Sequence, residues 1–103
     1  MTVENQKRRD GAWAIYWEID RLAKDLSIKA EVKSLCFVVN MLDDNLGETV
    51  QLELYAGDTS EAKRALFERR LREAEGVKNG LSYASYYNDP PPLQIHWSGC
   101  HDE

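Results

Sequence analysis

The strongest structural signal in this chain lies in residues 35–55, which read LCFVVNMLDDNLGETVQLELY. Both alternating sets of side chains between Leu35 and Leu42 are largely apolar, which predicts a strand covered on both faces and therefore central in its sheet. The segment Asp43–Glu48 is rich in Asp, Asn and Gly and predicts a turn. The next segment alternates apolar with polar residues, as does a strand with one face in solvent, and its apolar members are Val50, Leu52 and Leu54. The whole stretch therefore predicts a β-hairpin.

A helix is predicted before the hairpin, because apolar residues recur at alternating spacings of three and four: Ala12, Ile15, Ile19, Leu22 and Leu26. Either Thr2 or Asp10 could cap the N-terminus of this helix. Since Gly11 would cost about 1 kcal/mol in a helix interior, the pattern favours the later start at Asp10. A second helix is predicted after the hairpin, where Asp58 and Glu61 stand at capping-box spacing. That helix is expected to run to about Glu75, with Gly76 as its C-terminal glycine.

Two further strands are predicted at Leu81–Tyr87 and Leu93–Trp97, separated by the stiff turn at Asn88–Pro92. The expected fold class is α+β in the order α-β-β-α-β-β, with a four-stranded antiparallel sheet and two helices packed on one face. This order resembles the ferredoxin-like split βαβ fold with its first strand moved to the end. A single domain over residues 1–103 is expected, with frayed ends at 1–9 and 98–103.

The composition describes an acidic globular domain. The 103 residues are 43% hydrophobic and 30% charged, with a formal net charge of −5, so a chain-wide attraction to nucleic acid or to anionic membranes is not expected. The apolar runs are too short to span a bilayer, which makes a cytoplasmic location the expectation. The two cysteines, Cys36 and Cys100, do not form a disulfide framework. The spacing of His96, Cys100, His101 and Asp102 is irregular for a metal site, so no metal or other cofactor is expected.

Trp13 and Trp17 form the most suggestive pair of residues. Helical geometry places both about 130° to 170° from the apolar stripe of the first helix, on the side that carries charged residues. Large aromatic side chains are enriched at binding hot spots, so the pair could anchor a protein partner or a second copy of the chain. The alternative is that other elements of the same chain cover both rings.

Acidic residues are concentrated in the hairpin region. No Lys or Arg occurs between Lys33 and Lys63, and this segment carries a charge of −6 while the rest of the chain carries +1. The exposed part of the hairpin is therefore expected to form an acidic lobe that steers a basic partner surface through Asp43, Asp44, Glu48 and Glu53. The alternative is ordinary composition, because Asp is common in turns and Glu on the solvent faces of strands.

An alternative function rests on a short motif. The segment Tyr55–Thr59, followed by Arg64 on a helix, resembles the second half of the GIY-YIG nuclease motif, in which Tyr-x-Gly precedes an arginine-bearing helix. No Gly-Ile-Tyr strand precedes it, so no catalytic residue is assigned. A small nuclease or nucleic-acid-binding protein that uses Tyr55 and Arg64 remains the alternative.

The preferred hypothesis is a non-enzymatic protein-binding module of the inhibitor, immunity-protein or accessory-factor type. Its partner-binding residues would be Trp13 and Trp17 together with the four hairpin carboxylates. Self-association as a homodimer is also expected, through the tryptophan-bearing helix face or an open sheet edge.

Overall fold

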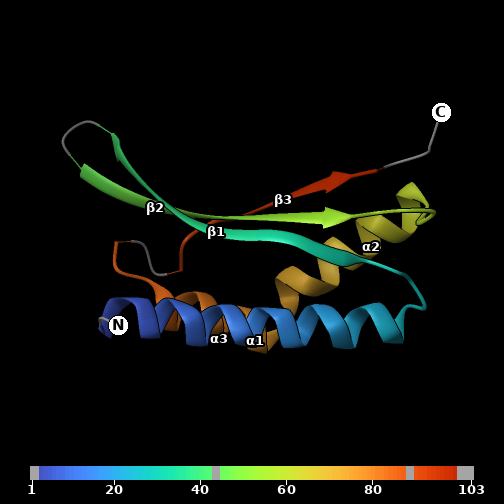
Figure 1. Cartoon of the computed structure of the whole chain (residues 1–103), viewed down its shortest axis with the longest axis horizontal. Helices are drawn as coiled ribbons and strands as arrows, with labels where there is room; N and C mark the ends of the chain where they lie inside the picture. The colour runs from blue at the N-terminus through green and yellow to red at the C-terminus, as the bar shows by residue number, and fades with distance from the viewer. Residues whose placement is uncertain (1–2, 43–44, 88–89, 100–103) are drawn as a thin grey trace.

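The computed structural model describes residues 3–42, 45–87 and 90–99. These residues form an α+β fold in which three helices lie on one side of a three-stranded sheet (Figure 1). The elements are α1 (Val3–Asp25), β1 (Glu31–Leu42), β2 (Asn45–Tyr55), α2 (Glu61–Glu73), α3 (Glu75–Ala84) and β3 (Leu93–Ser98). No helix in this described part of the chain is long and apolar enough to cross a lipid bilayer.

The predicted hairpin is confirmed, and β1 pairs with β2 in antiparallel orientation from Glu31 opposite Tyr55 to Leu42 opposite Asn45. The strand order is β1-β2-β3, so the central strand is β2 and not the apolar segment that begins at Leu35. Three side chains of β2 are almost completely buried under the helices: Val50, Leu52 and Leu54. No described element covers the opposite face, where Cys36 of β1 is exposed. The prediction of a strand covered on both faces is therefore wrong for this sheet.

The four-stranded antiparallel sheet is also wrong. The segment Leu81–Tyr87, predicted as a strand, contributes its first four residues to α3. Four residues of α3 are buried at helical spacing: Val77, Gly80, Leu81 and Ala84. The tyrosines that suggested a strand, Tyr83 and Tyr87, remain exposed. The burial of small residues on one side of this segment therefore outweighs the strand propensity of its tyrosines.

The segment that forms α3 packs closely against α1 at two glycines, and this contact favours a helix there over a strand. A Cβ atom added to Gly11 would lie 2.6 Å from the carbonyl oxygen of Gly80, and one added to Gly80 would lie 2.8 Å from that of Gly11. The two backbones therefore touch where neither residue has a side chain. This contact also accounts for the presence of a glycine inside α1, which begins at Val3 and not at the predicted Asp10.

The two helices between β2 and β3 determine the direction of the last strand. A connection that contains α2 and α3 is long enough to return the chain to the same end of the sheet, so β3 pairs with β2 in parallel orientation. The sheet is therefore mixed, and the permuted ferredoxin-like topology is not formed.

The boundaries of α2 differ from those predicted. Ser60, not Asp58, is the N-cap, and its hydroxyl oxygen accepts a 3.3 Å hydrogen bond from the backbone N–H of Lys63. The helix ends at Glu73, and Gly76 lies inside α3 rather than closing α2. The core lies between β2 and the helices, and its completely buried side chains include Ile15, Leu54, Phe67 and Leu71.

Candidate functional site

Trp13 and Trp17 lie on the side of α1 that points away from the sheet. Their side chains are 66% and 72% exposed, whereas Ile15 and Ile19, on the opposite side of the same helix, are buried. Trp13 packs edge-on against Tyr16, with ring centroids 6.1 Å apart. No element within the described ranges covers the two indole rings, so the alternative in which the chain itself buries them does not hold. Two large aromatic rings one turn apart thus form an exposed apolar surface.

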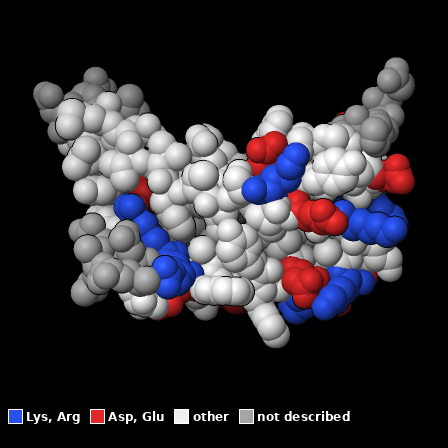
Figure 2. Space-filling model, viewed as in Figure 1, with Lys and Arg blue, Asp and Glu red and all other residues white. Residues whose placement is uncertain are grey.

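The charges beside this surface are paired along α1. Arg21 donates to Glu18 at 2.7 Å and to Asp25 at 3.1 Å, and Lys24 lies 2.9 Å from Asp20. The hydrogen bond that Arg21 donates to Glu18 and the negative charges of Glu18 and Asp25 raise the pKa of Arg21. Figure 2 shows red and blue side chains mixed at the end of the molecule where α1 terminates. The surroundings of the tryptophans therefore favour neither a basic nor an acidic partner.

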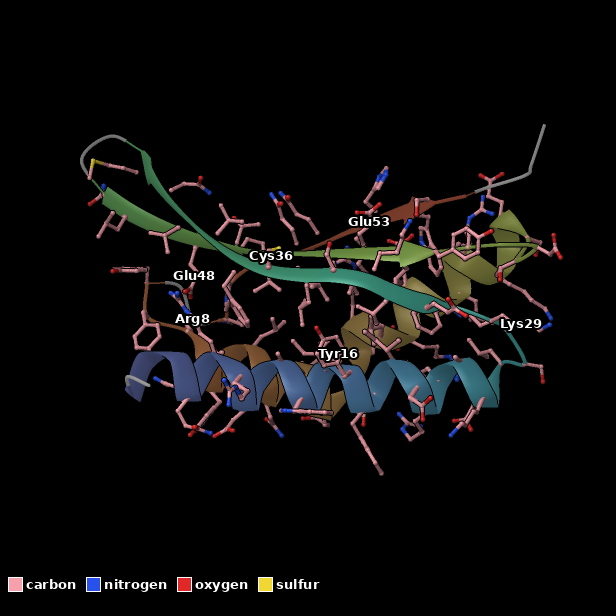
Figure 3. All side chains as sticks on the ribbon, viewed as in Figure 1. Arg8, Tyr16, Lys29, Cys36, Glu48 and Glu53 are labelled. Atoms are coloured by element: carbon pink, nitrogen blue, oxygen red, sulfur yellow. The ribbon has the colours of Figure 1, made fainter. Side chains whose placement is uncertain are left out.

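The structure does not join the four proposed hairpin carboxylates into one acidic surface. Asp43 and Asp44 lie outside the described residues. Glu53 is half-buried on the uncovered face of the sheet, and its side chain lies on the side of the sheet away from α1 (Figure 3). Glu48 is only 2% exposed, so the expectation that it faces solvent is wrong.

Glu48 is the buried member of an ion pair with half-buried Arg8, and this pair joins three segments of the fold. Arg8 of α1 donates from Nη2 to Glu48 Oε2 at 2.7 Å, and the backbone N–H of Tyr86 donates to Glu48 Oε1 at 3.1 Å. The guanidinium also lies over the rings of Tyr86 and Phe37, at 4.9 and 5.8 Å from their centroids. Figure 3 shows Arg8 and Glu48 facing each other between the helix and the sheet. This carboxylate therefore stabilises the fold, and it does not contribute to a docking surface.

The alternation of apolar and polar residues in residues 45–55 contains a signal for the burial of Glu48. Glu48 has the same parity as Val50, Leu52 and Leu54, so it falls on the helix-facing side of the strand. A carboxylate on the buried face of a strand requires a partner, and Arg8 supplies one from the preceding helix. The sequence alone does not indicate which basic residue of the helix reaches it.

The uncovered face of the sheet carries a shallow polar groove of about 440 Å³. Its polar lining comes from all three strands and includes Cys36, Gln51, Glu53, Gln94 and His96. Within the described ranges, no three His, Cys, Asp or Glu side chains are grouped as a metal site would require. Cys100, His101 and Asp102 lie outside the described residues.

The two residues of the nuclease-like motif have different surroundings. Tyr55 lines a second hollow, of about 520 Å³, together with Lys29, Asp58 and Lys63. Arg64 is not among the residues that line it, and its Nη1 donates to the backbone carbonyl of Thr59 at 2.6 Å. Arg64 thus holds the turn that precedes α2.

No known family model, curated protein or solved structure matches this chain.

Proposed function

We propose that this chain is a non-enzymatic protein-binding module, of the kind represented by small inhibitors, immunity proteins and accessory factors, and that Trp13 and Trp17 anchor its contact with a protein partner. The observation that carries this proposal is the exposure of both indole rings, one helical turn apart, on a helix face that no described element covers.

The energetics favour a contact role for the pair. A tryptophan side chain buries about 150–250 Å² when it is covered, so leaving two of them in solvent gives up a large stabilising contribution to the monomer. That contribution is recovered when a partner covers the rings. The paired charges around them, such as Lys24 with Asp20, would form the polar rim that commonly surrounds a hot spot.

The complementary surface on the partner is an apolar groove that receives two rings spaced by one helical turn. Because Glu48 is buried and Glu53 lies on the side of the sheet away from α1, charge steering by the hairpin is not part of this proposal.

The test is site-specific photo-cross-linking in the native host. A photoreactive amino acid is placed at position 17 and, as a control, at position 69, where Arg69 is exposed on α2. A partner that cross-links from position 17 and not from position 69 supports the proposal. Equal cross-linking at the two positions contradicts it.

The captured partner is then titrated against purified variants. The double substitution Trp13→Ala and Trp17→Ala is expected to weaken binding by at least about 30-fold, the effect of losing one hot-spot residue. Tyr83→Ala removes an exposed aromatic ring from α3 and serves as the matched control, with affinity expected to be unchanged. Equal affinities for the wild type and the double tryptophan variant would reject this surface as the anchor.

A further inference from the structure

The two edges of the sheet are not equivalent, and the hydrogen bonds of β2 show how they differ. The N–H of Val50 donates to the carbonyl of Pro92 at 2.9 Å, and the N–H of Ala56 donates to that of Ser98 at 2.8 Å. Even-numbered residues of β2 therefore direct their backbone polar groups toward β3. The accepting carbonyls of Pro92 and Ser98 belong to even-numbered residues. Because successive residues of a strand direct their backbone groups to opposite sides, the carbonyl of odd-numbered Leu93 points away from β2, to the outer edge of β3.

The outer edge of β3 is guarded by α2. Arg72 donates from Nη1 to the carbonyl of Leu93, which is one of the outward-pointing groups. The indole N–H of Trp97 donates to Glu68 Oε2 at 3.0 Å and holds the other end of β3 against the same helix. This edge is thus short and partly occupied by side chains, two of the devices by which proteins prevent strand addition.

Among the residues that the structure describes, none guards the outer edge of β1 in this way. Because the backbone groups of Val50 point toward β3, its partner across the hairpin, Phe37, forms a non-hydrogen-bonded pair with it. The backbone groups of Phe37 therefore point to the free edge, together with those of the other odd-numbered residues. These residues are Leu35, Phe37, Val39 and Met41. Within the described ranges, no group forms a hydrogen bond with their outward-pointing backbone N–H and C=O groups.

The chemistry of β1 also leaves this edge open. The nine residues from Ser34 to Leu42 include no charged residue and no proline. A register shift at Lys33 protects only the first part of the strand. The helix-facing side chains of Leu35 and Phe37 are half-buried, whereas those of their partners on β2, Leu52 and Val50, are almost completely buried. The helical layer therefore does not extend past β1 and does not block its edge.

We infer that β1 is the self-association surface of this protein, and that the occupant of its edge is the β1 strand of a second copy, paired in antiparallel orientation about a two-fold axis at Val38. Since α2 guards β3, pairing of β1 with β3 of another copy is disfavoured, and the contact closes as a dimer instead of extending as a polymer. The product is a continuous six-stranded sheet with the helices of both copies on the same side.

The length of the uncharged segment selects the register. Val38 is the midpoint of Ser34–Leu42, so a two-fold axis there uses the whole segment and leaves Lys33 outside the ladder. The odd-numbered residues, whose backbone groups are free, then face one another, with Phe37 opposite Val39 and Leu35 opposite Met41. Each of these pairs exchanges two backbone hydrogen bonds.

The same register covers exposed apolar side chains. In the single chain Val39 is 41% exposed and Met41 is 69% exposed. Both lie on the helix-facing side of β1, where the pairing places them against Phe37 and Leu35 of the second copy. On the other face, the two Val38 side chains meet directly across the axis.

The first test is the oligomeric state of two matched lysine variants, measured by analytical ultracentrifugation from low to high micromolar concentration. The wild type is expected to approach twice its chain mass of 11.9 kDa. Val38→Lys places like charges opposite each other across the axis and is expected to raise the dissociation constant of the dimer at least about tenfold. Thr49→Lys adds the same charge on the same sheet face, one strand inward and opposite Val38, and is expected to leave the dimer intact.

The inference would be overturned by a wild type that stays monomeric throughout, by larger open assemblies, or by equal effects of the two lysine substitutions. A monomeric wild type would leave the edge available to an extended segment of another protein instead. The double substitution Trp13→Ala and Trp17→Ala separates this surface from the proposed partner surface, because it is expected to leave the dimer unchanged. Loss of the dimer in that variant would assign self-association to the tryptophan face.

A second test reads the register and does not require a disruptive substitution. In a background with Cys36→Ser and Cys100→Ser, Val38→Cys places one thiol from each copy across the axis, within the Cα separation that a disulfide allows. Added copper phenanthroline in air, which removes two electrons and two protons from the thiol pair, is expected to give a covalent dimer. Thr49→Cys in the same background is expected to stay unlinked. Equal cross-linking at positions 38 and 49 would contradict the proposed register.

Discussion

Arg8 and Glu48 show how a single buried contact connects distant parts of this chain. The side chain of Glu48 has no solvent exposure, and Arg8 is its charged partner at 2.7 Å. If the cation is removed, the buried carboxylate still carries its cost of desolvation but has lost the compensating attraction. Removal of one partner is therefore expected to lower the free energy of unfolding more than removal of both.

Arg8→Met is therefore expected to lower the free energy of unfolding by about 3–5 kcal/mol, as judged by urea denaturation. Adding Glu48→Leu to that variant is expected to recover a large part of the loss, because the uncompensated charge is removed. Arg9→Met changes an exposed neighbour and is expected to stay within about 0.5 kcal/mol of the wild type. If Arg8→Met and Arg9→Met had equal effects, the buried pair would not be stabilising.

Ser27 adopts a left-handed backbone conformation, with φ of 55°, just after the end of α1. The turn is closed by the N–H of Ile28, which donates to the carbonyl of Ala23 at 2.9 Å. A non-glycine residue in this region costs about 1–2 kcal/mol, part of which is offset by its smaller entropy in the unfolded chain.

Ser27→Gly is therefore expected to raise the free energy of unfolding by up to about 1 kcal/mol in the same assay. Ser85→Gly is the matched control at the end of α3, where φ is −76° and glycine relieves no strain. It is expected to be neutral or destabilising. A stabilising effect of both substitutions would show that the backbone conformation at Ser27 is not the cause.

At the scale of the elements, the contact between α1 and α3 depends on the absence of side chains. The atom nearest to a Cβ at Gly80 would be the backbone oxygen of Gly11, which cannot rotate away as a flexible side chain can. Packing therefore opposes any larger residue there, although alanine has the higher helix propensity.

Gly80→Ala is expected to destabilise the fold by about 1–3 kcal/mol in urea denaturation, because α1 and α3 must move apart. Ser82→Ala makes a comparable change at an exposed position of the same helix and is expected to be neutral or slightly stabilising. If Gly80→Ala proved as stable as Ser82→Ala, the two helices would not be held at this distance by their glycines.

The elements also show which predictions depended on local sequence alone. The first helix and the hairpin are confirmed, because each has an apolar pattern that repeats over several turns or residue pairs. The segment at Leu81–Tyr87 lacks such a pattern when it is considered alone. The helical pattern of small residues that it shares with the preceding segment, Gly80 and Ala84, becomes recognisable only when Gly11 of α1 is known to pack against them.

At the scale of the whole molecule, exposed surfaces are distributed over separate sides. The tryptophans lie on the side of α1 away from the sheet, the polar groove lies on the uncovered sheet face, and the unprotected strand edge belongs to β1. The proposed partner contact and the proposed dimer contact thus use different surfaces and can be disrupted separately.

The double substitution Trp13→Ala and Trp17→Ala is expected to change the free energy of unfolding by less than about 1 kcal/mol, because each ring is mostly solvated in the folded chain. Acrylamide quenching provides an independent measurement. The wild type is expected to show strong quenching from these two residues, and the variant is expected to retain only the weaker quenching of half-buried Trp97. Strong protection of the wild-type fluorescence in a dilute monomer would contradict the exposure of both rings.

The local pattern of the sequence determined the hairpin, the first helix and the placement of Trp13 and Trp17 opposite the apolar stripe, because each depends on the periodicity of one element. Only the tertiary structure decided that Leu81 belongs to a helix, that β2 is central, that β3 is parallel to it and that Arg8 is the partner of Glu48. These features depend on contacts between segments far apart in the chain, whose energies outweigh local propensity. The acidic segment therefore divides between residues that hold the fold together and residues that remain at its surface.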